Sequence, residues 1–340
     1  MRILVTGGLG VVGKPVVRRL VQSGHQVRVV DRQAGECVEG VECIPCDVTD
    51  FAAVREQVRG QEVIVHLAAI AYPAGAAGQE IFRINCAGTF NVYEAAAQEG
   101  IRRIATASSI NWLGFYYGVR NSNIRYFPVD EEHPNFTTDA YSFSKQVTED
   151  IAAYYGRREG ISSTCLRMPG VVEFKEEWLP RRKEWIAQTR KTFIELSERT
   201  PEERAAWLTQ LLEKTEQWRA KRWQEIPFEE RQSQGFGLDN PEVRLVSSRM
   251  NFWTLLDARD AAQAFEKSLL ADFEGCHPLF ANDSHNSTGI ETETLLGLFF
   301  PDVTARKRPI VGSEALVSID RARQLIGFEP EYSFSKWFSD

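Results

Sequence analysis

A tyrosine and a lysine placed four residues apart give this sequence its clearest catalytic candidate. The segment Asp139–Lys145 reads DAYSFSK, so Tyr141 and Lys145 lie one turn apart on one face if the segment opens a helix. A phenol has a reference pKa of about 10. An ammonium beside it favours the phenolate, so the phenol can exchange a proton with a reacting hydroxyl or carbonyl near neutral pH. So short a pattern also occurs by chance, and the elements that precede it decide its meaning.

Three glycines near the start of the chain predict a turn that binds a dinucleotide. The predicted strand Ile3–Val5 runs into TGGLGVVG, which contains Gly7, Gly10 and Gly13, and a helix is expected over Lys14–Gln22. Gly7 permits the tight turn, Gly10 lets the backbone approach a pyrophosphate, and Gly13 lets the helix pack closely on the strand. The first N–H groups of the helix would then be free to bind the phosphates.

The residues after the second predicted strand indicate which dinucleotide is bound. The strand Gln26–Val30 ends at Asp31, whose carboxylate can hold ribose hydroxyls and repels a 2′-phosphate. This favours NAD. Arg32 comes next and could receive a 2′-phosphate, so NADP stays the second possibility. The structural alternative is that Asp31 is simply a turn residue.

Strands and helices alternate along the first half of the chain. The further elements that we expect there are Glu42–Pro45, Phe51–Val58, Glu62–His66, Gln79–Gln98, Arg103–Ala107, Tyr141–Gly156 and Ser162–Arg167. This alternation predicts right-handed βαβ units in a doubly wound parallel sheet. Ligands bind beyond the carboxyl ends of strands in such sheets. Asp31, Ala68, Ser108 and Ser109 all fall at predicted strand ends.

Composition and charge narrow the function classes. With 340 residues, the chain has room for one large α/β domain or for a domain and a smaller lobe. Its net charge of -7 is unlike a nucleic-acid-binding surface, and no apolar run is long enough to cross a membrane. Because the chain opens directly on a strand, we expect no signal peptide and a cytoplasmic location.

The cysteines offer no clear metal or redox site. Six are present, and Cys43 with Cys46 forms a C-x-x-C pair. A second pair and a nearby histidine, which a zinc site would need, are missing from the sequence around it. We expect buried or incidental thiols and no metal.

Taken together, these pieces resemble the extended short-chain dehydrogenases/reductases, also known as the NAD-dependent epimerase/dehydratase family. The resemblance covers about the first 170 residues. Its matching features, in family order, are TGGLGVVG, Asp31, Asp47-Val48, HLAA at 66–69, Asn85, Gly88-Thr89, Ser108-Ser109, Tyr141 and Lys145.

The resemblance implies a role for each catalytic candidate. Tyr141 would be the general acid/base, and Lys145 would lower its pKa and hold the nicotinamide ribose. Ser109 would hydrogen-bond the reacting oxygen, with Ser108 as the second candidate.

The resemblance also implies a cofactor site and a substrate site. Asp47 and Val48 would lie beside the adenine, and Asn85 would support the active-site backbone or a nearby water. The implied cofactor-binding residues are Gly7, Gly10, Val11, Val12, Gly13, Asp31, Arg32, Asp47, Val48, Leu67, Ala68, Ala69, Asn85, Tyr141 and Lys145. The implied substrate-binding residues are Ser108, Ser109, Asn111 and Tyr141.

The segment after the serine pair departs from the family's sugar-nucleotide epimerases. It reads SSINWLG, with Leu113 where those enzymes carry a tyrosine. The segment is instead similar to uronate dehydrogenases, in which a histidine stands at the position of Asn111. Asn111 could bind a substrate hydroxyl or simply cap a loop. Trp253 stands where epimerases often carry a phosphate-binding arginine, which Arg244 or Arg249 could replace.

A charge-dense stretch, Glu173–Arg231, holds five of the eight tryptophans. They are Trp178, Trp185, Trp207, Trp218 and Trp223. One helix is expected from Pro180 to about Arg199, and Thr200 with Glu203 has the capping-box spacing of a second. We expect an antiparallel helical pair whose Trp/Leu stripe packs on the body of the protein. The alternative is a lid or partner surface over the substrate cleft.

The rest of the chain completes the expected domain organisation. A strand at Arg249–Leu256, a helix at Asp257–Leu270 and later elements at Pro278–Ala281, Glu291–Phe299 and Ser318–Ile326 are expected. A dinucleotide-binding Rossmann domain would span 1–170, with 243–270 returning to it. A mainly helical substrate lobe would comprise 171–242 and 271–340, including the insert at about 175–231.

These observations predict an NAD(P)-dependent oxidoreductase that moves hydride between nicotinamide and a secondary alcohol or ketone of a sugar, sugar acid or similar polyol. One alternative is a nucleotide-sugar epimerase that uses the same Ser/Tyr/Lys set with tightly held NAD. Another is a non-catalytic NAD(P)-sensing regulator, although a sensor has no need of a proton relay. The helices Gln79–Gln98 and Tyr141–Gly156 would suit the family's usual homodimer.

Overall fold

An eight-stranded sheet carries the predicted nucleotide-binding elements. Its strand order is β10-β7-β6-β5-β1-β2-β4-β3. The strands are β1 (Arg2–Thr6), β2 (Gln26–Asp31), β3 (Gly35–Val38), β4 (Val41–Pro45), β5 (Val63–His66), β6 (Arg103–Ser109), β7 (Ser162–Met168) and β10 (Cys276–Phe280). All neighbours pair in parallel except β3, which runs antiparallel to β4.

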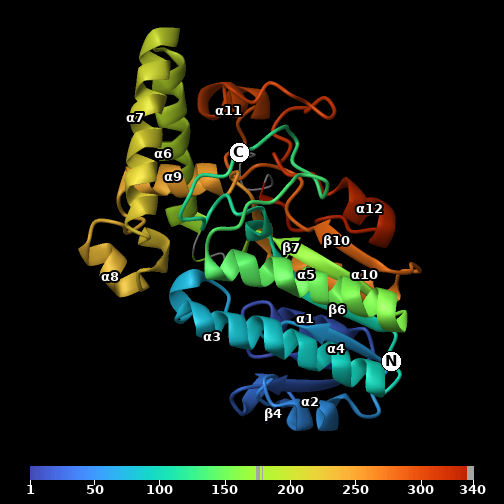
Figure 1. Ribbon diagram of the computed structural model, residues 1–340. Helices are drawn as coiled ribbons and strands as arrows, with labels where there is room; N and C mark the ends of the chain where they lie inside the picture. The colour runs from blue at the N-terminus through green and yellow to red at the C-terminus, as the bar shows by residue number, and fades with distance from the viewer. Residues whose placement is uncertain (174–176, 178, 335–340) are drawn as a thin grey trace.

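The computed structural model describes residues 1–173, 177 and 179–334 (Figure 1). Trp178 of the predicted insert and residues 335–340 at the end of the predicted lobe lie outside the described residues. Among the helices of the described part, none has both the length and the apolar character that crossing a bilayer requires.

Helices cover both faces of the sheet, so the predicted doubly wound fold is confirmed (Figure 1). One face is covered by α1 (Gly13–Gln22), α10 (Ala258–Leu270) and α12 (Asp320–Ile326), and the other by α2 (Phe51–Val58), α4 (Gly88–Gln98) and α5 (Ala140–Glu159). Side chains alternate along β1: Ile3 and Val5 join the first core, whereas Leu4 joins the second.

The strand order reverses at β1, which lies between β2 and β5. Such a reversal opens a crevice at the carboxyl ends of the strands. Gly7 follows β1 and has a φ of 74°, and a Cβ on it would lie 2.6 Å from the backbone nitrogen of Ala68. Only glycine fits this close approach between the first turn and the end of β5.

The predicted helix Gln79–Gln98 is continuous but irregular. It consists of α3 (Gly78–Phe82), a π-helical turn over Arg83–Ala87, and α4. The π turn contains Asn85. Insertions of this kind are frequent at functional sites because they re-aim a side chain.

A second lobe is built mainly from helices. They are α6 (Leu179–Ser197), α7 (Pro201–Ala220), α8 (Phe228–Ser233), α9 (Pro241–Met250) and α11 (Thr292–Phe299). Short 3-10 turns η1 (Pro73–Gly75), η3 (Ile110–Leu113) and η5 (Trp223–Glu225) and the two-stranded sheet of β8 (Gly170–Val172) with β9 (Leu255–Asp257) complete the connections. Thr200 and Glu203 form the predicted capping box of α7.

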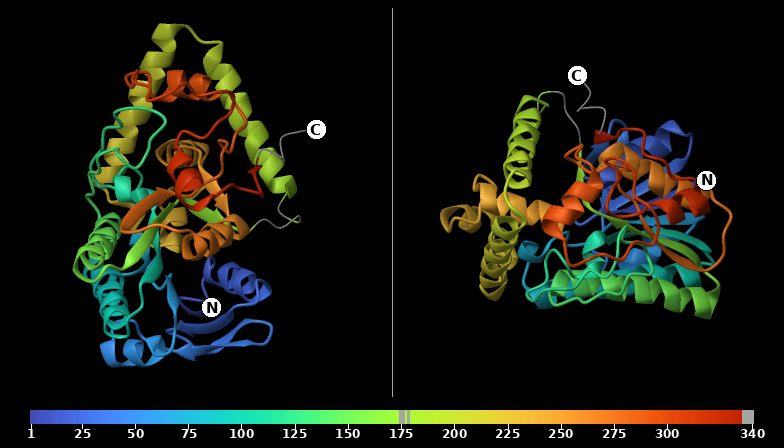
Figure 2. Two further views of the ribbon diagram at one scale, coloured as in Figure 1. Left: turned by 90° about the vertical axis from the view of Figure 1, so that its right-hand side faces the viewer. Right: turned by 90° about the horizontal axis from the view of Figure 1, so that it is seen from above.

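The two long helices of the insert do not pack on each other along their length. They diverge from their junction, and α11 lies between them (Figure 2). The ring of Phe299 in α11 contacts Phe193 of α6 and Trp207 of α7, with ring centroids 5.2 and 5.9 Å apart. The expected helical pair is therefore splayed apart, and aromatic residues of both helices pack on α11.

Two sequence-based boundaries differ from the structure. The strand expected over Arg249–Leu256 forms only at its end, where β9 begins at Leu255. Before it, the expectation was wrong: α9 runs to Met250, and Phe252 and Trp253 follow at positive φ with both rings buried. Strand β10, which the sequence placed in the lobe, is instead the edge strand of the main sheet. Burial of the aromatic rings outweighs the strand preference of their residues.

Candidate active site

The amino terminus of α5 places Tyr141 and Lys145. Asp139 caps the helix by accepting a 2.8 Å hydrogen bond from the Ser142 backbone nitrogen. Tyr141 and Lys145 then project from its first two turns and are only 5% and 4% exposed. Lys145 Nζ donates a 2.9 Å hydrogen bond to the carbonyl oxygen of Ala107 in β6 and lies 5.8 Å from the Tyr141 ring centroid.

Burial dominates the protonation of this pair. It raises the pKa of Tyr141 to about 12, against the lowering effect of a hydrogen bond with Ser109. Burial also lowers the pKa of Lys145 to about 8. Burial, which disfavours the charged phenolate, outweighs the lowering of the phenol pKa that the Tyr–Lys spacing predicted. Tyr141 is held as a protonated phenol, ready to donate.

Strand alternation separates the roles of the two serines. Ser108 Oγ donates a 2.6 Å hydrogen bond to Glu149 Oε1, inside a buried network with Arg167. Ser109 lies on the other side of the strand, where its Oγ accepts from the backbone and side-chain nitrogens of Asn111 at 3.1 and 3.2 Å and hydrogen-bonds Tyr141. The geometry therefore favours Ser109 and gives no support to a substrate-binding role for Ser108.

The glycine turn has the shape and polarity that a pyrophosphate needs. A Cβ on Gly13 would lie 2.3 Å from the Gly7 oxygen, so helix and turn pack closely, whereas a Cβ on Gly10 would meet only that oxygen at 3.3 Å. The amino end of α1 has Val12 as its N-cap, without a side-chain hydrogen bond, and no acidic residue in its first turn. Val11 beside it is 65% exposed. The backbone N–H groups at the amino end of α1 could therefore bind an anionic group such as a phosphate.

The predicted ribose and adenine positions follow along the same crevice. Asp31 Oδ2 accepts a 3.1 Å hydrogen bond from the Leu9 backbone nitrogen, which places the carboxylate beside the glycine turn. Backbone and side-chain hydrogen bonds from Thr49 lower the pKa of Asp47, and Arg32 is close enough to lower it further.

Close packing holds the strand ends that border the crevice. The side chain of Val48 packs on Gly88, where a Cβ would meet it at 2.7 Å. The backbones of Leu67 and Ala68 lie against Gly7, and Ala69 follows them into the loop.

Asn85 fixes the backbone after the LAA segment. Its Oδ1 accepts from the Ile70 backbone nitrogen at 2.7 Å, and its Nδ2 donates to the Ile70 carbonyl at 3.0 Å and to Ser144 Oγ at 2.9 Å. The neighbouring His66 bonds to Thr6 and Thr89, and burial lowers its pKa to about 3. His66 is thus a neutral, fully bonded packing residue.

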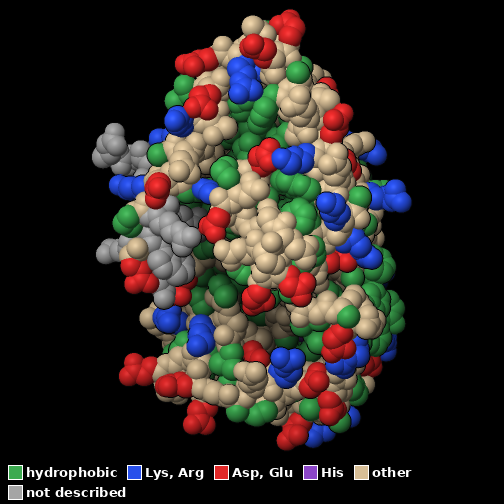
Figure 3. Space-filling view, turned by 90° about the vertical axis from the view of Figure 1, so that its left-hand side faces the viewer, with side chains coloured by type: hydrophobic (Ala, Val, Ile, Leu, Met, Phe, Trp, Pro, Cys, Tyr) green, Lys and Arg blue, Asp and Glu red, His purple; other side chains and the backbone are tan. Residues whose placement is uncertain are grey.

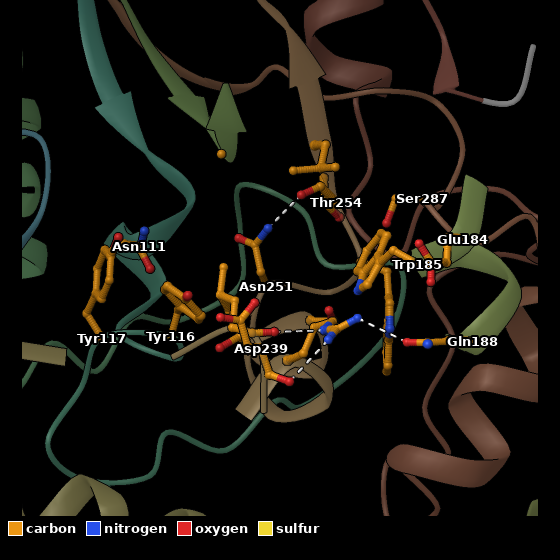
Figure 4. Close-up of a pocket in the computed structure, with 17 residues that line it drawn as sticks. Asn111, Tyr116, Tyr117, Glu184, Trp185, Gln188, Asp239, Asn251, Thr254 and Ser287 are labelled. Atoms are coloured by element: carbon orange, nitrogen blue, oxygen red, sulfur yellow. Dashed lines mark hydrogen bonds between the residues drawn. The ribbon is translucent and has the colours of Figure 1, made fainter. Parts of the chain in front are cut away.

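A cavity of about 730 Å³ lies beside Asn111, on a side of the molecule that is hollowed between the two lobes (Figures 3 and 4). Its lining residues are mostly amides, hydroxyls and aromatic rings: Asn111, Tyr116, Tyr117, Gly170, Glu184, Trp185, Gln188, Leu238, Asp239, Arg244, Ser247, Ser248, Asn251, Trp253, Thr254, Leu255 and Ser287. The volume is within the range of about 300–1,000 Å³ that is usual for small-molecule sites.

Three buried polar atoms of this lining have no hydrogen-bond partner among the described residues. They are Asn111 Oδ1, Ser247 Oγ and Trp253 Nε1. Buried polar groups are normally paired, so an acceptor, a hydroxyl and a donor left unpaired around one cavity indicate a polar ligand.

The lining settles which of two candidate cations faces the cavity. Arg244 does so, with its guanidinium donating to the Leu238 carbonyl at 2.9 Å. Arg249 is instead partly buried over the ring of Phe300 and donates to the Phe299 carbonyl at 3.0 Å.

Several residues of this site escaped the sequence analysis. Tyr116 and Tyr117 lie close behind the serine pair in sequence, and that nearness was the available signal. Trp185 and Gln188 of α6 reach the cavity from the insert, which makes α6 a wall of the pocket (Figure 4). No local sequence pattern in the insert predicts that these two residues line the cavity.

The described residues contain no group of three His, Cys, Asp or Glu side chains that could hold a metal. Cys43 and Cys46 belong to the cores on opposite faces of the sheet, so the C-x-x-C pair does not converge. Burial raises the pKa of each thiol to about 11. Both behave as buried apolar residues, as expected.

Comparisons with known proteins show the family of the chain. The family model described as NAD dependent epimerase/dehydratase family matches residues 3–172. The uronate dehydrogenase of Pseudomonas putida is 34% identical over 169 residues, which are 49% of this chain and 60% of that protein. The L-arabinose 1-dehydrogenase (NAD(P)(+)) of Haloferax volcanii is 33% identical over 172 residues, 49% of this chain and 66% of that protein. The match thus spans about three fifths of these relatives.

Solved structures share the fold over almost the entire chain. A mutated uronate dehydrogenase aligns with a TM-score of 0.60 and 20% identity, covering 99% of this chain and 84% of that one. A UDP-glucose 4-epimerase with UDP-glucose from Thermotoga maritima aligns with a TM-score of 0.61 and 19% identity, covering 99% and 96%. Together with the match over half of its length, this fold shows that the chain belongs to the NAD-dependent epimerase/dehydratase family.

Proposed function

We propose that the protein is an NAD-dependent oxidoreductase that transfers hydride between nicotinamide and a secondary alcohol or ketone of a sugar, sugar acid or similar polyol. The observation that carries this proposal is the Ser109–Tyr141–Lys145 group at the carboxyl edge of the sheet, adjoining a cavity through Asn111. Family membership and the polar and aromatic lining of the cavity support it.

NAD is the cofactor that the site fits. The glycine turn and the amino end of α1 bind its pyrophosphate, Asp31 binds the adenosine ribose, and Asp47 lies toward the adenine. When bound, NAD supplies the nicotinamide that accepts or returns the hydride. Lys145 holds the nicotinamide ribose. Because Asp31 repels a 2′-phosphate, NADP binds more weakly.

The protein's own residues manage the proton. In the oxidation direction, the phenolate form of Tyr141 would accept the proton of the substrate hydroxyl at Oη while the carbon gives its hydride to the nicotinamide; in the reduction direction, the phenol would return the proton to the carbonyl oxygen. Ser109 hydrogen-bonds that oxygen and keeps it in line with the phenol. Lys145, near the ring and almost fully buried, favours the phenolate in the step that needs it.

An activity panel tests this function. Purified protein with NAD or NADP is offered uronic acids, L-arabinose, other aldoses and polyols, and UDP-glucose, while the absorbance of the reduced nicotinamide is followed. We expect NAD reduction with at least one sugar. No nicotinamide reduction with any member, by a protein that binds NAD, would contradict the proposal.

The second candidate is a nucleotide-sugar epimerase that uses the same three residues. It is favoured by Arg244, a cation in the cavity, and by a 31% match to a putative UDP-glucose 4-epimerase of Methanocaldococcus jannaschii. An epimerase has to retain its hydride between half-reactions. Near-stoichiometric NAD released on denaturing the purified protein would therefore favour the epimerase, and a site that exchanges NAD freely would favour the dehydrogenase.

We further propose a homodimer formed through α3, α4 and α5. Two stacked aromatic pairs on these helices are exposed: Phe82 with Phe143, and Phe90 with Tyr154. Exposed apolar patches of this kind mark interaction surfaces. Phe90→Glu should give a monomer in size-exclusion chromatography with light scattering; a wild type that is already monomeric would contradict this proposal.

We also propose a cytoplasmic location and a division of labour between the lobes. The six cysteines are free thiols, as a reducing compartment would keep them, and cell fractionation would check the location. The sheet domain, about 1–170 with α10 and β10, binds the dinucleotide, and the helical lobe binds the substrate. Limited proteolysis with and without NAD would check this division.

A further inference from the structure

The loop after η3 brings a second tyrosine against Tyr141. Tyr117 stands edge-on to the Tyr141 ring, with centroids 5.6 Å apart and ring planes at 84°. On its other side Tyr117 contacts Tyr116, and both line the cavity together with Asn111. Tyr117 therefore lines the cavity and also contacts the ring of Tyr141, whose phenol the reaction uses.

The insert holds this loop at two points. Arg219, near the end of α7 and 2% exposed, donates from Nη2 to the Phe115 carbonyl at 2.6 Å and from Nη1 to the Gly118 carbonyl. These two carbonyls flank Tyr116 and Tyr117. One guanidinium thus fixes both ends of the short segment that carries the tyrosines, with the planar fork that only arginine offers.

Close packing restricts the backbone conformation of this loop. Gly114 has a φ of 76°, and a Cβ on it would lie 2.0 Å from the Phe136 carbonyl oxygen. A Cβ on Gly118 would lie 2.4 Å from the Gly114 oxygen. The ring of Phe115 is buried and stacks on Phe252 at 5.1 Å. Tight packing and the Arg219 clamp together determine where the Tyr117 ring lies.

We propose that Tyr117 is a positioning residue for the reaction, and that the Trp-rich insert controls it through the two-point clamp of Arg219 on the loop 115–118. The inference rests on the proposed function and deepens it. The Tyr117 ring orients the Tyr141 phenol and shields it from water, so the insert is part of the catalytic framework and not only a wall of the cavity.

The groups whose charge reaches this pair come from several elements. Those that act on the two phenols directly are Asp139 and Lys145 of α5, Tyr116 of the loop and Arg231 of α8. Glu225 acts on Asp139, and Arg219 interacts with both Asp139 and Glu216. The Tyr117 variants leave all of these groups in place, so a shift in their pH profile reports the contact between the two tyrosine rings. Arg219→Met also removes a buried cation, so its profile is compared with that of Tyr117→Ala.

Four variants test the proposal on the panel sugar that the wild type oxidises fastest. Tyr117→Ala and Arg219→Met remove the ring and the clamp. Tyr117→Phe keeps the ring. Arg249→Met is the matched control, because it also removes a guanidinium from the lobe, but one whose hydrogen bond goes to the Phe299 carbonyl of α11 and which approaches the loop only over the Phe115 ring, 5.7 Å from its centroid. NAD titration and thermal unfolding show which variants are folded.

We expect Tyr117→Ala and Arg219→Met to lower kcat by about tenfold to a hundredfold, the usual cost of a small misplacement, with NAD affinity unchanged. Burial raises the pKa of Tyr141, so admitting water lowers it. In a plot of kcat against pH, the rise in kcat that accompanies ionisation of Tyr141 (the phenolate limb) should then move to lower pH. Tyr117→Phe should keep the wild-type limb, and Arg249→Met should lower stability without moving the limb.

Two results would overturn the inference while leaving the function intact. One is an active wild-type enzyme together with Tyr117→Ala and Arg219→Met variants whose kcat shows the same pH dependence as the wild type. The other is an Arg249→Met variant that loses as much kcat, with the same shift, as Arg219→Met. A wild type that shows no nicotinamide reduction with any panel sugar would overturn the proposed function and the inference with it.

Discussion

The buried ion pair between Arg167 and Glu149, which lies beside Ser108 of β6, should stabilise the fold strongly. The variant Glu149→Gln tests this prediction. Arg167 donates to both Glu149 oxygens, at 2.9 and 2.7 Å, and the two side chains are 2% and 6% exposed. Arg167 also lies over the Trp112 ring, 3.5 Å from its centroid. The amide of the variant keeps the shape but leaves a buried cation without its counter-ion. Such a loss costs about 3–5 kcal/mol of unfolding free energy.

A matched exposed pair supplies the control. Arg323 binds Glu329 with the same two-pronged geometry, at 2.6 and 2.8 Å, but these side chains are 34% and 59% exposed. Glu329→Gln should cost only about 0–1 kcal/mol, because water screens the charges. Urea unfolding followed by circular dichroism measures both variants. Equal losses for the two variants, within about 1 kcal/mol, would refute the reasoning that burial makes the difference.

Three further predictions concern the cofactor turn, pH and the loop after β5. Gly10→Ala should change stability only slightly but weaken NAD binding in a calorimetric titration, since the added Cβ meets only the Gly7 oxygen, at 3.3 Å, yet narrows the turn proposed to bind the pyrophosphate; unchanged affinity would contradict this. His66→Asn should flatten the loss of stability between about pH 6.5 and 3: the native imidazole stays neutral there while the unfolded one binds a proton, so acid favours unfolding, and an unchanged slope in pH-dependent urea unfolding would refute the assignment. Asn85→Ala should cost about 1–3 kcal/mol in urea unfolding, because it removes the hydrogen bonds of Asn85 to the partly buried N–H and carbonyl of Ile70 and to Ser144 Oγ; a loss below that range would show that other contacts hold the loop after β5.

The cofactor half of the site follows from local sequence. The glycine spacing, the strand before it and the helix after it are short-range features, and the structure places Gly7 and Gly13 in contacts that only glycine allows. The preference for Ser109 over Ser108 came from the family resemblance and not from the local residue pattern, because the structural reason for it involves Glu149 in another helix. Alternation along a strand shows that two neighbouring serines face opposite sides, but not which side holds the active site.

The substrate half depends on contacts between distant segments. Phe299 separates α6 from α7, and Arg219 reaches a loop about a hundred residues earlier in the chain. Neither leaves a periodic pattern in the sequence. The strand predicted over Arg249–Leu256 failed for a related reason: Asn240 caps a helix there, and the buried rings that follow set the backbone. The Asn-Pro pair that begins α9 was a signal available in the sequence.

The proposed reaction depends most directly on Tyr141 as the group that moves the proton. The measurement that tests it compares kcat of the wild type and Tyr141→Phe on the same sugar, with NAD affinity measured on both proteins. We expect kcat to fall by about 10²–10⁴-fold, the usual contribution of general acid–base catalysis, at unchanged NAD affinity. A phenylalanine variant that keeps wild-type kcat would contradict the assignment of Tyr141 and the reaction built on it.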